Sequence, residues 1–220
     1  RLYNWNHKEG SYSNLVASAF SPDGQYAVTA GQQTMVLWEV TSGKPHWFWN
    51  APAGILDVAL APGGNFALLG LVNHTAVAFD IKNGGLKQTL HHEGRVRAVD
   101  LSDDGRLGLT GSDNRLAKLW DMNEGKLLQT VTHDNSVNTV ALSPNGRLAF
   151  SASQLDKAYI WDTQSSEILH TLSGDEGFLP KRLSYRAAAF SPNSAVPAPR
   201  AKPATCQSGV KAVGLTRRLT

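Results

Sequence analysis

The residues most able to do chemistry in this chain are its seven histidines, which include the adjacent pair His91-His92. A metal site or a catalytic base requires such side chains to converge on one point in space. His92 and His133 instead stand 41 positions apart in similar surroundings, "HHEG" and "THDN", which is typical of a repeated structural position. Cys206 is the single cysteine, and no Cys/His pair has the spacing of zinc ligands. We therefore predict neither a metal site nor a cofactor.

Nucleophilic catalysis has no better support in the sequence. It contains no G-x-S-x-G elbow, no phosphate-binding loop and no dinucleotide fingerprint. Ser21 and Ser143 lie in short stretches with proline and glycine, where turn formation explains a serine. The paired acids Asp103-Asp104 lie in a stretch of the same kind, and we expect them to be solvated. The prediction is a protein without catalytic residues.

Composition places the chain among ordinary globular proteins. Of its 220 residues 41% are hydrophobic and 18% are charged, so a packed core is expected. No apolar run approaches the roughly 20 residues that cross a bilayer, and we predict no transmembrane segment. The chain begins at Arg1 rather than Met, so we expect that an original N-terminus precedes it.

The basic character of the chain is confined to one end. From Ala195 onward there are five basic residues and no acids, which leaves 16 basic and 18 acidic residues in 1–194. The body therefore lacks the positive field that phosphate binding demands, and we predict no nucleic-acid binding from it.

Two markers recur through the chain at a common spacing. An aromatic-acid pair stands at Trp38-Glu39, Phe79-Asp80, Trp120-Asp121 and Trp161-Asp162, always 41 residues apart. The stretches "AFSPDG", "ALAPGG", "DLSDDG" and "ALSPNG" keep step with it from Ala19, Ala59, Asp100 and Ala141, and "AFSPNS" follows from Ala189. A period in this range indicates a repeat architecture.

Each repeat has the pattern of four short strands joined by turns. In the third repeat the strands are predicted at 96–101, 107–111, 116–121 and 127–132. Proline at the second position and glycine at the fourth position of the SPDG-like stretches favour a type I turn. Four-stranded antiparallel sheets stacked around an axis cover each other's apolar faces, which predicts an all-β fold of β-propeller type.

The SPDG-like turn, the closing Trp-Asp and the 41-residue step resemble the WD-repeat β-propeller family over residues 1–194. The resemblance implies a ring of about seven blades, of which this chain holds a part. We expect an outer strand at 1–7, blades at about 15–50, 55–91, 96–132 and 137–172, and the start of a fifth blade at 184–194.

The resemblance also assigns structural roles to repeated residues. In the family the Trp belongs to a buried hydrogen-bonded set with a Ser or Thr of strand two, a turn Asp and a His that precedes strand one. No repeat keeps the whole set, so we expect apolar packing to contribute more than the polar set. The predicted structural positions are Trp38, Phe79, Asp80, Trp120, Asp121, Trp161, Asp162, His92 and His133.

Partner binding is predicted in two loops whose lengths depart from the repeat. An insertion at 10–14 contains Tyr12, and seven extra residues lie within 174–185, where Phe178 and Leu179 stand beside Lys181 and Arg182. Aromatic and arginine side chains dominate interface hot spots. A neutral length variant is the alternative, because surface loops tolerate insertions.

The leading functional prediction is a non-catalytic protein–protein interaction scaffold whose partner the sequence does not identify. The alternative is an accessory or regulatory propeller domain of a larger enzyme or multidomain protein, and nucleic-acid binding is third. The regular SPDG and SPNG turns favour a bacterial source, in the cytoplasm or the cell envelope, although the compartment is not encoded in these residues.

The repeat fails near the C-terminus. A fifth aromatic is expected near position 209, where Gly209 stands, and 195–220 is rich in Pro, Ala and basic residues. Such a composition favours a natural disordered tail. A reading-frame slip near Ala195–Pro197 is the alternative, and resequencing the source DNA distinguishes the two.

Overall fold

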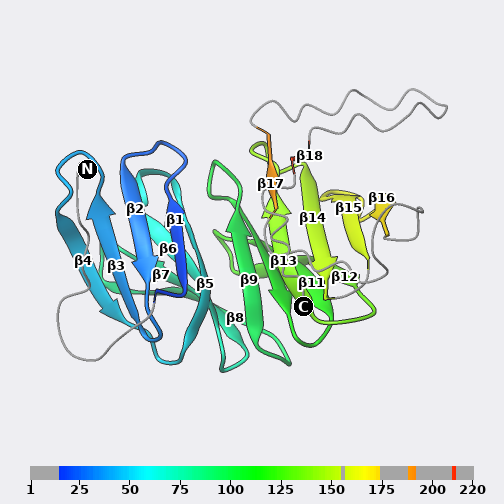
Figure 1. Ribbon diagram of the computed structural model, residues 1–220, viewed down its shortest axis with the longest axis horizontal. Coiled ribbons are helices and arrows are strands. Elements are labelled where there is room, and N and C mark those ends of the chain that lie inside the picture. Colours follow the sequence, from blue (N-terminus) through cyan, green and yellow to red (C-terminus); the bar gives the residue numbers. More distant parts are fainter. Residues whose placement is uncertain (1–14, 155–156, 174–187, 192–209, 212–220) are drawn as a thin grey trace, which may run out of the picture.

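The computed structural model describes residues 15–154, 157–173, 188–191 and 210–211. Apart from one 3-10 turn, η1 (Pro62–Gly64), every regular element within these ranges is a β-strand. The strands form four four-stranded sheets that stand side by side in chain order, from β1–β4 at one end to β13–β16 at the other (Figure 1).

Each sheet, called a blade from here on, is formed by four consecutive strands. Blade 1 contains β1 (Ala17–Phe20), β2 (Tyr26–Ala30), β3 (Thr34–Glu39) and β4 (Pro45–Asn50). Blade 2 contains β5 (Ile55–Leu60), β6 (Phe66–Leu71), β7 (Thr75–Asp80) and β8 (Gly85–His91). Blade 3 contains β9 (Val96–Leu101), β10 (Leu107–Ser112), β11 (Leu116–Asp121) and β12 (Lys126–Thr132). Blade 4 contains β13 (Val137–Leu142), β14 (Leu148–Ser153), β15 (Ala158–Asp162) and β16 (Ile168–Leu172).

The predicted all-β fold of four-stranded antiparallel blades is confirmed. Every neighbouring pair within a blade is antiparallel, and the first strands of successive blades, β1, β5, β9 and β13, lie next to one another. The register between strands three and four shifts at the repeated aromatic residue of each blade, namely Trp38, Phe79, Trp120 and Trp161. That the array is part of a larger ring stays a prediction.

In blades 1, 3 and 4 the turn between strands one and two ends in a glycine with positive φ. In blade 2, at η1, both Gly63 and Gly64 have positive φ, which departs from the predicted type I turn. Gly24, Gly105 and Gly146 adopt φ of 69°, 69° and 67°, where a residue with a Cβ would be strained. The Gly24 N–H donates to the Ser21 carbonyl oxygen at 2.8 Å, and the equivalent bonds to Ser102 and Ser143 are 2.8 and 2.7 Å long. The serine hydroxyl then accepts the N–H of the first strand-two residue, as Ser102 does from Leu107.

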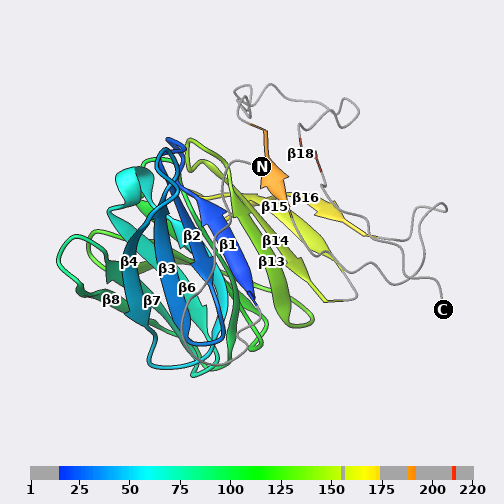
Figure 2. The same cartoon turned by 60° about the vertical axis from the view of Figure 1, so that its left-hand side comes forward.

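The core lies between blades rather than within them. Strands alternate, so each blade presents apolar side chains on both faces. Val28, Met35 and Leu37 of blade 1 pack against Leu69 and Phe79 of blade 2. Similar apolar clusters fill the spaces between blades 2 and 3 and between blades 3 and 4. A blade is therefore stabilised mainly by its neighbours. Figure 2 shows the same sheets after a turn of 60°, with the strands of blade 4 on the right.

A further strand pair lies beyond blade 4. β17 (Ala189–Phe190) pairs antiparallel with β18 (Val210–Lys211), and Phe190 packs against the outer apolar cluster of blade 4. The segment 195–220, which was expected to form no blade strand, thus contributes β18. Two strands of two residues each do not make a fifth blade.

Candidate functional site

A buried polar chain crosses blade 3 from its leading loop to its third strand. Nε2 of His92 lies 2.7 Å from Oγ1 of Thr110, and the indole N–H of Trp120 donates to the same oxygen at 2.8 Å. Thr110 also lies 3.2 Å from the carbonyl oxygen of Lys118. All three chain members are buried, so one threonine hydroxyl joins a loop and two strands.

Blade 4 repeats this chain with a serine. Nε2 of His133 lies 2.8 Å from Oγ of Ser151, and the Trp161 indole N–H donates to that oxygen at 3.1 Å. His133 also lies against Tyr159, with ring centroids 4.6 Å apart. Blades 3 and 4 therefore each keep three members of the polar set, and that apolar packing contributes more than this set stays a prediction.

Both histidines are neutral at physiological pH. Burial, and to a lesser degree the positive charge of Lys118, lowers the pKa of His92 to about 4. Burial likewise lowers the pKa of His133 to about 4. Neither Nδ1 atom has a hydrogen-bond partner. A neutral, enclosed imidazole that bonds its own blade is a structural element, not a base that reaches a substrate.

Blade 1 keeps the indole-to-hydroxyl hydrogen bond of this arrangement, and blade 2 does not. In blade 1 the Trp38 indole N–H donates to Thr29 at 2.8 Å. Blade 2 has apolar residues at all three positions, Ala51, Leu69 and Phe79. The Phe79 ring stacks on Trp49 of blade 1, with centroids 4.4 Å apart. Apolar packing thus replaces the polar chain in blade 2 alone.

The acid of each aromatic-acid pair closes the turn between strands three and four. Asp80 accepts from the backbone N–H of Asn83, and Asp121 accepts from the N–H groups of Asn123 and Glu124. Asp162 accepts from Gln164 and Ser165 in the same way. These hydrogen bonds lower the pKa of Asp80 and Asp162, so both carboxylates are charged acceptors that fix the turn.

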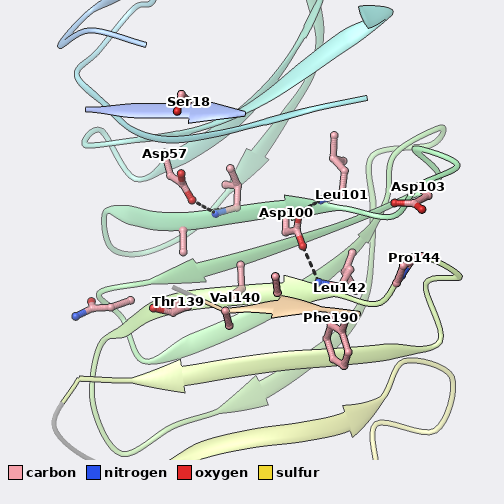
Figure 3. Close-up of a pocket in the computed structure, with 15 residues that line it drawn as sticks. Ser18, Asp57, Asp100, Leu101, Asp103, Thr139, Val140, Leu142, Pro144 and Phe190 are labelled. Carbon is pink, nitrogen blue, oxygen red and sulfur yellow. Dashed lines mark hydrogen bonds between the residues drawn. The ribbon is translucent and has the colours of Figure 1, made fainter. Parts of the chain in front are cut away.

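Two acids that the sequence reasoning missed, Asp57 and Asp100, connect neighbouring blades at the inner strands. Asp57 of β5 accepts the N–H of Val99 on β9 at 2.9 Å, and Asp100 of β9 accepts the N–H of Leu142 on β13 at 2.7 Å. Figure 3 shows both carboxylates pointing at the next blade. The signal was visible at Asp100, because Ala59 and Ala141 occupy its place in "ALAPGG" and "ALSPNG".

Asp57 and Asp100 line a cavity of about 460 Å³ beside the inner strands. Burial raises the pKa of Asp57 to about 6 and that of Asp100 to about 7. Each carboxylate already accepts two backbone N–H groups, because Val58 and Leu101 donate to the same side chains. The acids therefore satisfy inner-strand N–H groups that have no sheet partner.

One apolar surface stays uncovered on blade 1. Phe20 is 63% exposed, whereas its counterparts Leu60, Leu101 and Leu142 are at most 8% exposed against the preceding blade. Phe48 of β4 is 56% exposed. Exposed apolar area of this kind marks a contact surface.

The two predicted partner loops, at 10–14 and 174–185, lie outside the described residues. Tyr12, Phe178, Leu179, Lys181 and Arg182 lie outside the described residues, as does His7. Among the residues that the structure does describe, no three His, Cys, Asp or Glu side chains gather where they could hold a metal ion. No helix in the same ranges has the length and hydrophobicity to cross a membrane.

Comparison with known proteins gives one family. The family model of the WD domain, G-beta repeat, matches residues 6–39, 84–121 and 125–162, which together are half of the chain. The second match covers β8, the outer strand of blade 2, and then β9, β10 and β11 of blade 3. One sequence repeat therefore supplies the last strand of one blade and the first three strands of the next. The interval 40–83, between the first and second matches, contains the apolar residues of blade 2 named above, Ala51, Leu69 and Phe79. No curated protein matches the chain.

Proposed function

Because the chain belongs to the WD40 repeat family, we propose that it acts as a non-catalytic scaffold for protein–protein interaction. WD40 repeats are generally interaction scaffolds. The support from this chain is that its described histidines at repeat positions and its Trp-Asp pairs are used within the blades, which leaves the exposed blade ends for partners.

The observation that carries the proposal is a repeated frame of blades whose exposed turn side chains differ from blade to blade. His74 and Arg115 occupy the same place in the turns after strand two of blades 2 and 3, with φ of 70° and 69°. Both side chains are exposed. A non-glycine residue in this conformation costs of order 1 kcal/mol and persists only where its surroundings enforce it. Partners would therefore meet prearranged side chains.

Capture of partners by the immobilised full chain tests the proposal. A protein retained by the wild-type chain should be identified and then shown to bind in purified form with one-to-one or another fixed stoichiometry. Two variants then show which surface contributes to the affinity for that partner. One lacks 174–185, and the other carries Phe20→Ser. A purified chain that binds no protein partner from its native source would contradict the proposal.

A further inference from the structure

The end of blade 3 at which β9 begins carries three exposed arginines, Arg95, Arg97 and Arg115. Arg95 directly precedes β9, and its carbonyl oxygen accepts the N–H of Asp113 at 2.9 Å. Arg115 closes the turn that contains Asp113. We call these three residues the arginine rim.

Two of the three guanidinium groups are available to a ligand. Arg97 forms a two-contact ion pair with Asp113 through Nε and Nη2. Arg95 and Arg115 make no ion pair and no side-chain hydrogen bond in the described part of the chain. Asp113 is thus neutralised locally, and the rim keeps a net positive charge beside the acid Glu93.

The backbone that carries the rim is held in place. A Cβ on Gly94 would lie 2.7 Å from the backbone nitrogen of Asn114, so the loop before β9 is packed directly on the turn before Arg115. The carbonyl oxygen of Arg115 accepts the N–H of His133 at 2.8 Å. The loop and turn that carry the free arginines are therefore fixed before any ligand arrives, which lowers the entropic cost of binding.

The corresponding ends of blades 2 and 4 differ from this composition at the described positions. The counterparts of Arg95 are Gly54 and Ser136, and those of Arg97 are Leu56 and Asn138. Blade 3 is therefore distinguished from its neighbours by charge, although its backbone is the same.

We propose that the arginine rim binds an acidic segment of a protein partner through Asp or Glu side chains. Guanidinium groups match carboxylates in two-contact geometry, as Arg97 and Asp113 illustrate at this place. Two free arginines interspersed with Glu93 and Asp113 would neutralise few phosphates, which disfavours a nucleic acid. This proposal rests on the proposed function and specifies the chemistry of the partner.

Fluorescence anisotropy with a labelled short peptide of alternating Glu and Ser tests the rim. The wild-type chain should bind it, more weakly as salt rises, and should not bind the Gln–Ser analogue. The double variant Arg95→Ser, Arg115→Asn should bind roughly tenfold more weakly or worse, because charge-assisted hydrogen bonds are lost. Asn tolerates the left-handed conformation of position 115, so the turn should survive.

The matched control is Arg106→Ser, Arg147→Ser, which removes the same charge from the opposite end of blades 3 and 4. Equal weakening in both double variants, or no binding of the Glu–Ser peptide by the wild type, would overturn the proposal. So would tighter binding of a single-stranded oligonucleotide that is lost in the rim variant. A protein partner that still binds the rim variant would refute the rim alone, whereas the absence of any protein partner would refute the proposed function.

Discussion

Blades 2 and 4 have the same backbone and different interiors. In blade 4, His133, Ser151 and Trp161 form a buried chain of hydrogen bonds. In blade 2, Leu69 and Phe79 occupy the corresponding places and are fully buried. Strand lengths, pairing and the register shift at the aromatic are nevertheless alike. The fold thus requires an aromatic side chain at this position of strand three, but it does not require the indole hydrogen bond.

The comparison also shows that the replacement is coordinated. A buried indole N–H requires an acceptor, and a buried hydroxyl requires a partner, so a single substitution would leave an unpaired group. Blade 2 lacks the histidine, the hydroxyl and the indole together, and its Phe79 ring stacks on Trp49 instead. Each interior is therefore satisfied in its own way, and exchange of single residues between them should be costly.

The largest effect is expected from removal of either ring. Phe79→Ala and Trp161→Ala should each lower the free energy of unfolding by about 3–5 kcal/mol, because a large cavity forms between blades. Denaturant unfolding of the two variants measures this. A loss at Phe79 much smaller than that at Trp161 would show that blade 2 is less well packed than its full burial indicates.

The next largest effect is the pH dependence of the free energy of unfolding, which His92 and His133 cause in blades 3 and 4 and which blade 2 lacks at the corresponding position. The pKa of His92 and of His133 is about 4 in the folded chain, below the ordinary 6.5, so the unfolded chain binds protons first as pH falls. Each histidine contributes stability that is present above pH 6.5 and is lost towards pH 4, up to about 3 kcal/mol. Denaturant unfolding of His133→Gln between pH 4 and 7 should show roughly half of the combined loss that the two histidines cause in the wild-type chain.

Asp57 and Asp100 act with the opposite sign and provide the internal control. Their raised pKa values of about 6 and 7 give stability that is full below the ordinary value of 3.8 and is lost as pH rises through 6 and 7. Asp100→Asn should therefore remove a fall of stability as pH rises from about 4 to 7, whereas His133→Gln should remove a rise of stability from about pH 4 to 6.5. Identical pH profiles for the two variants would contradict both assignments.

Exchange of the rings between blades should have a smaller effect. Trp161→Phe should cost about 1–3 kcal/mol, because the Ser151 hydroxyl loses the indole N–H that donates to it. Phe79→Trp should also destabilise, because Leu69 offers the indole no acceptor. Leu69→Thr should recover part of that loss in the Phe79→Trp background, and a double-mutant cycle measures the coupling. Additive effects would mean that the hydrogen bond does not form in blade 2.

The smallest effect is expected from completion of the polar chain in blade 3. The side-chain amide atoms of Asn114 and Nδ1 of His92 have no partners. Asn114→Asp would place a carboxylate where Nδ1 can donate, and we expect a gain of roughly 1 kcal/mol together with a higher His92 pKa. Thermal unfolding and the histidine proton resonances measure the two changes. Blade 2, which has no such histidine, should show no gain from Asn73→Asp.

Much of the fold could be predicted because its signals are local. The strands predicted at 96–101 and 116–121 are β9 and β11, and the glycine-containing turns lie where proline and glycine stand. The inter-blade acids and the arginine rim were not predicted. Asp57 bonds to Val99 only because separate repeats are brought together. Arg95 lies near Arg115 because strand pairing within blade 3 returns the turn after β10 to the start of β9. Both inter-blade hydrogen bonds span 42 residues, but an acid at that spacing shows a contact only once the blades are packed.

The sequence by itself determined a series of four-stranded antiparallel units, because alternation, turn residues and the 41-residue step act within one repeat. Only the tertiary structure decided the states of the polar residues. Packing of blade on blade buries His92 and His133 as neutral rings and turns Asp57 and Asp100 towards neighbouring backbones. It also leaves Arg95 and Arg115 exposed. The physical reason is that burial, and therefore charge state and availability for binding, depends on what the neighbouring blade covers.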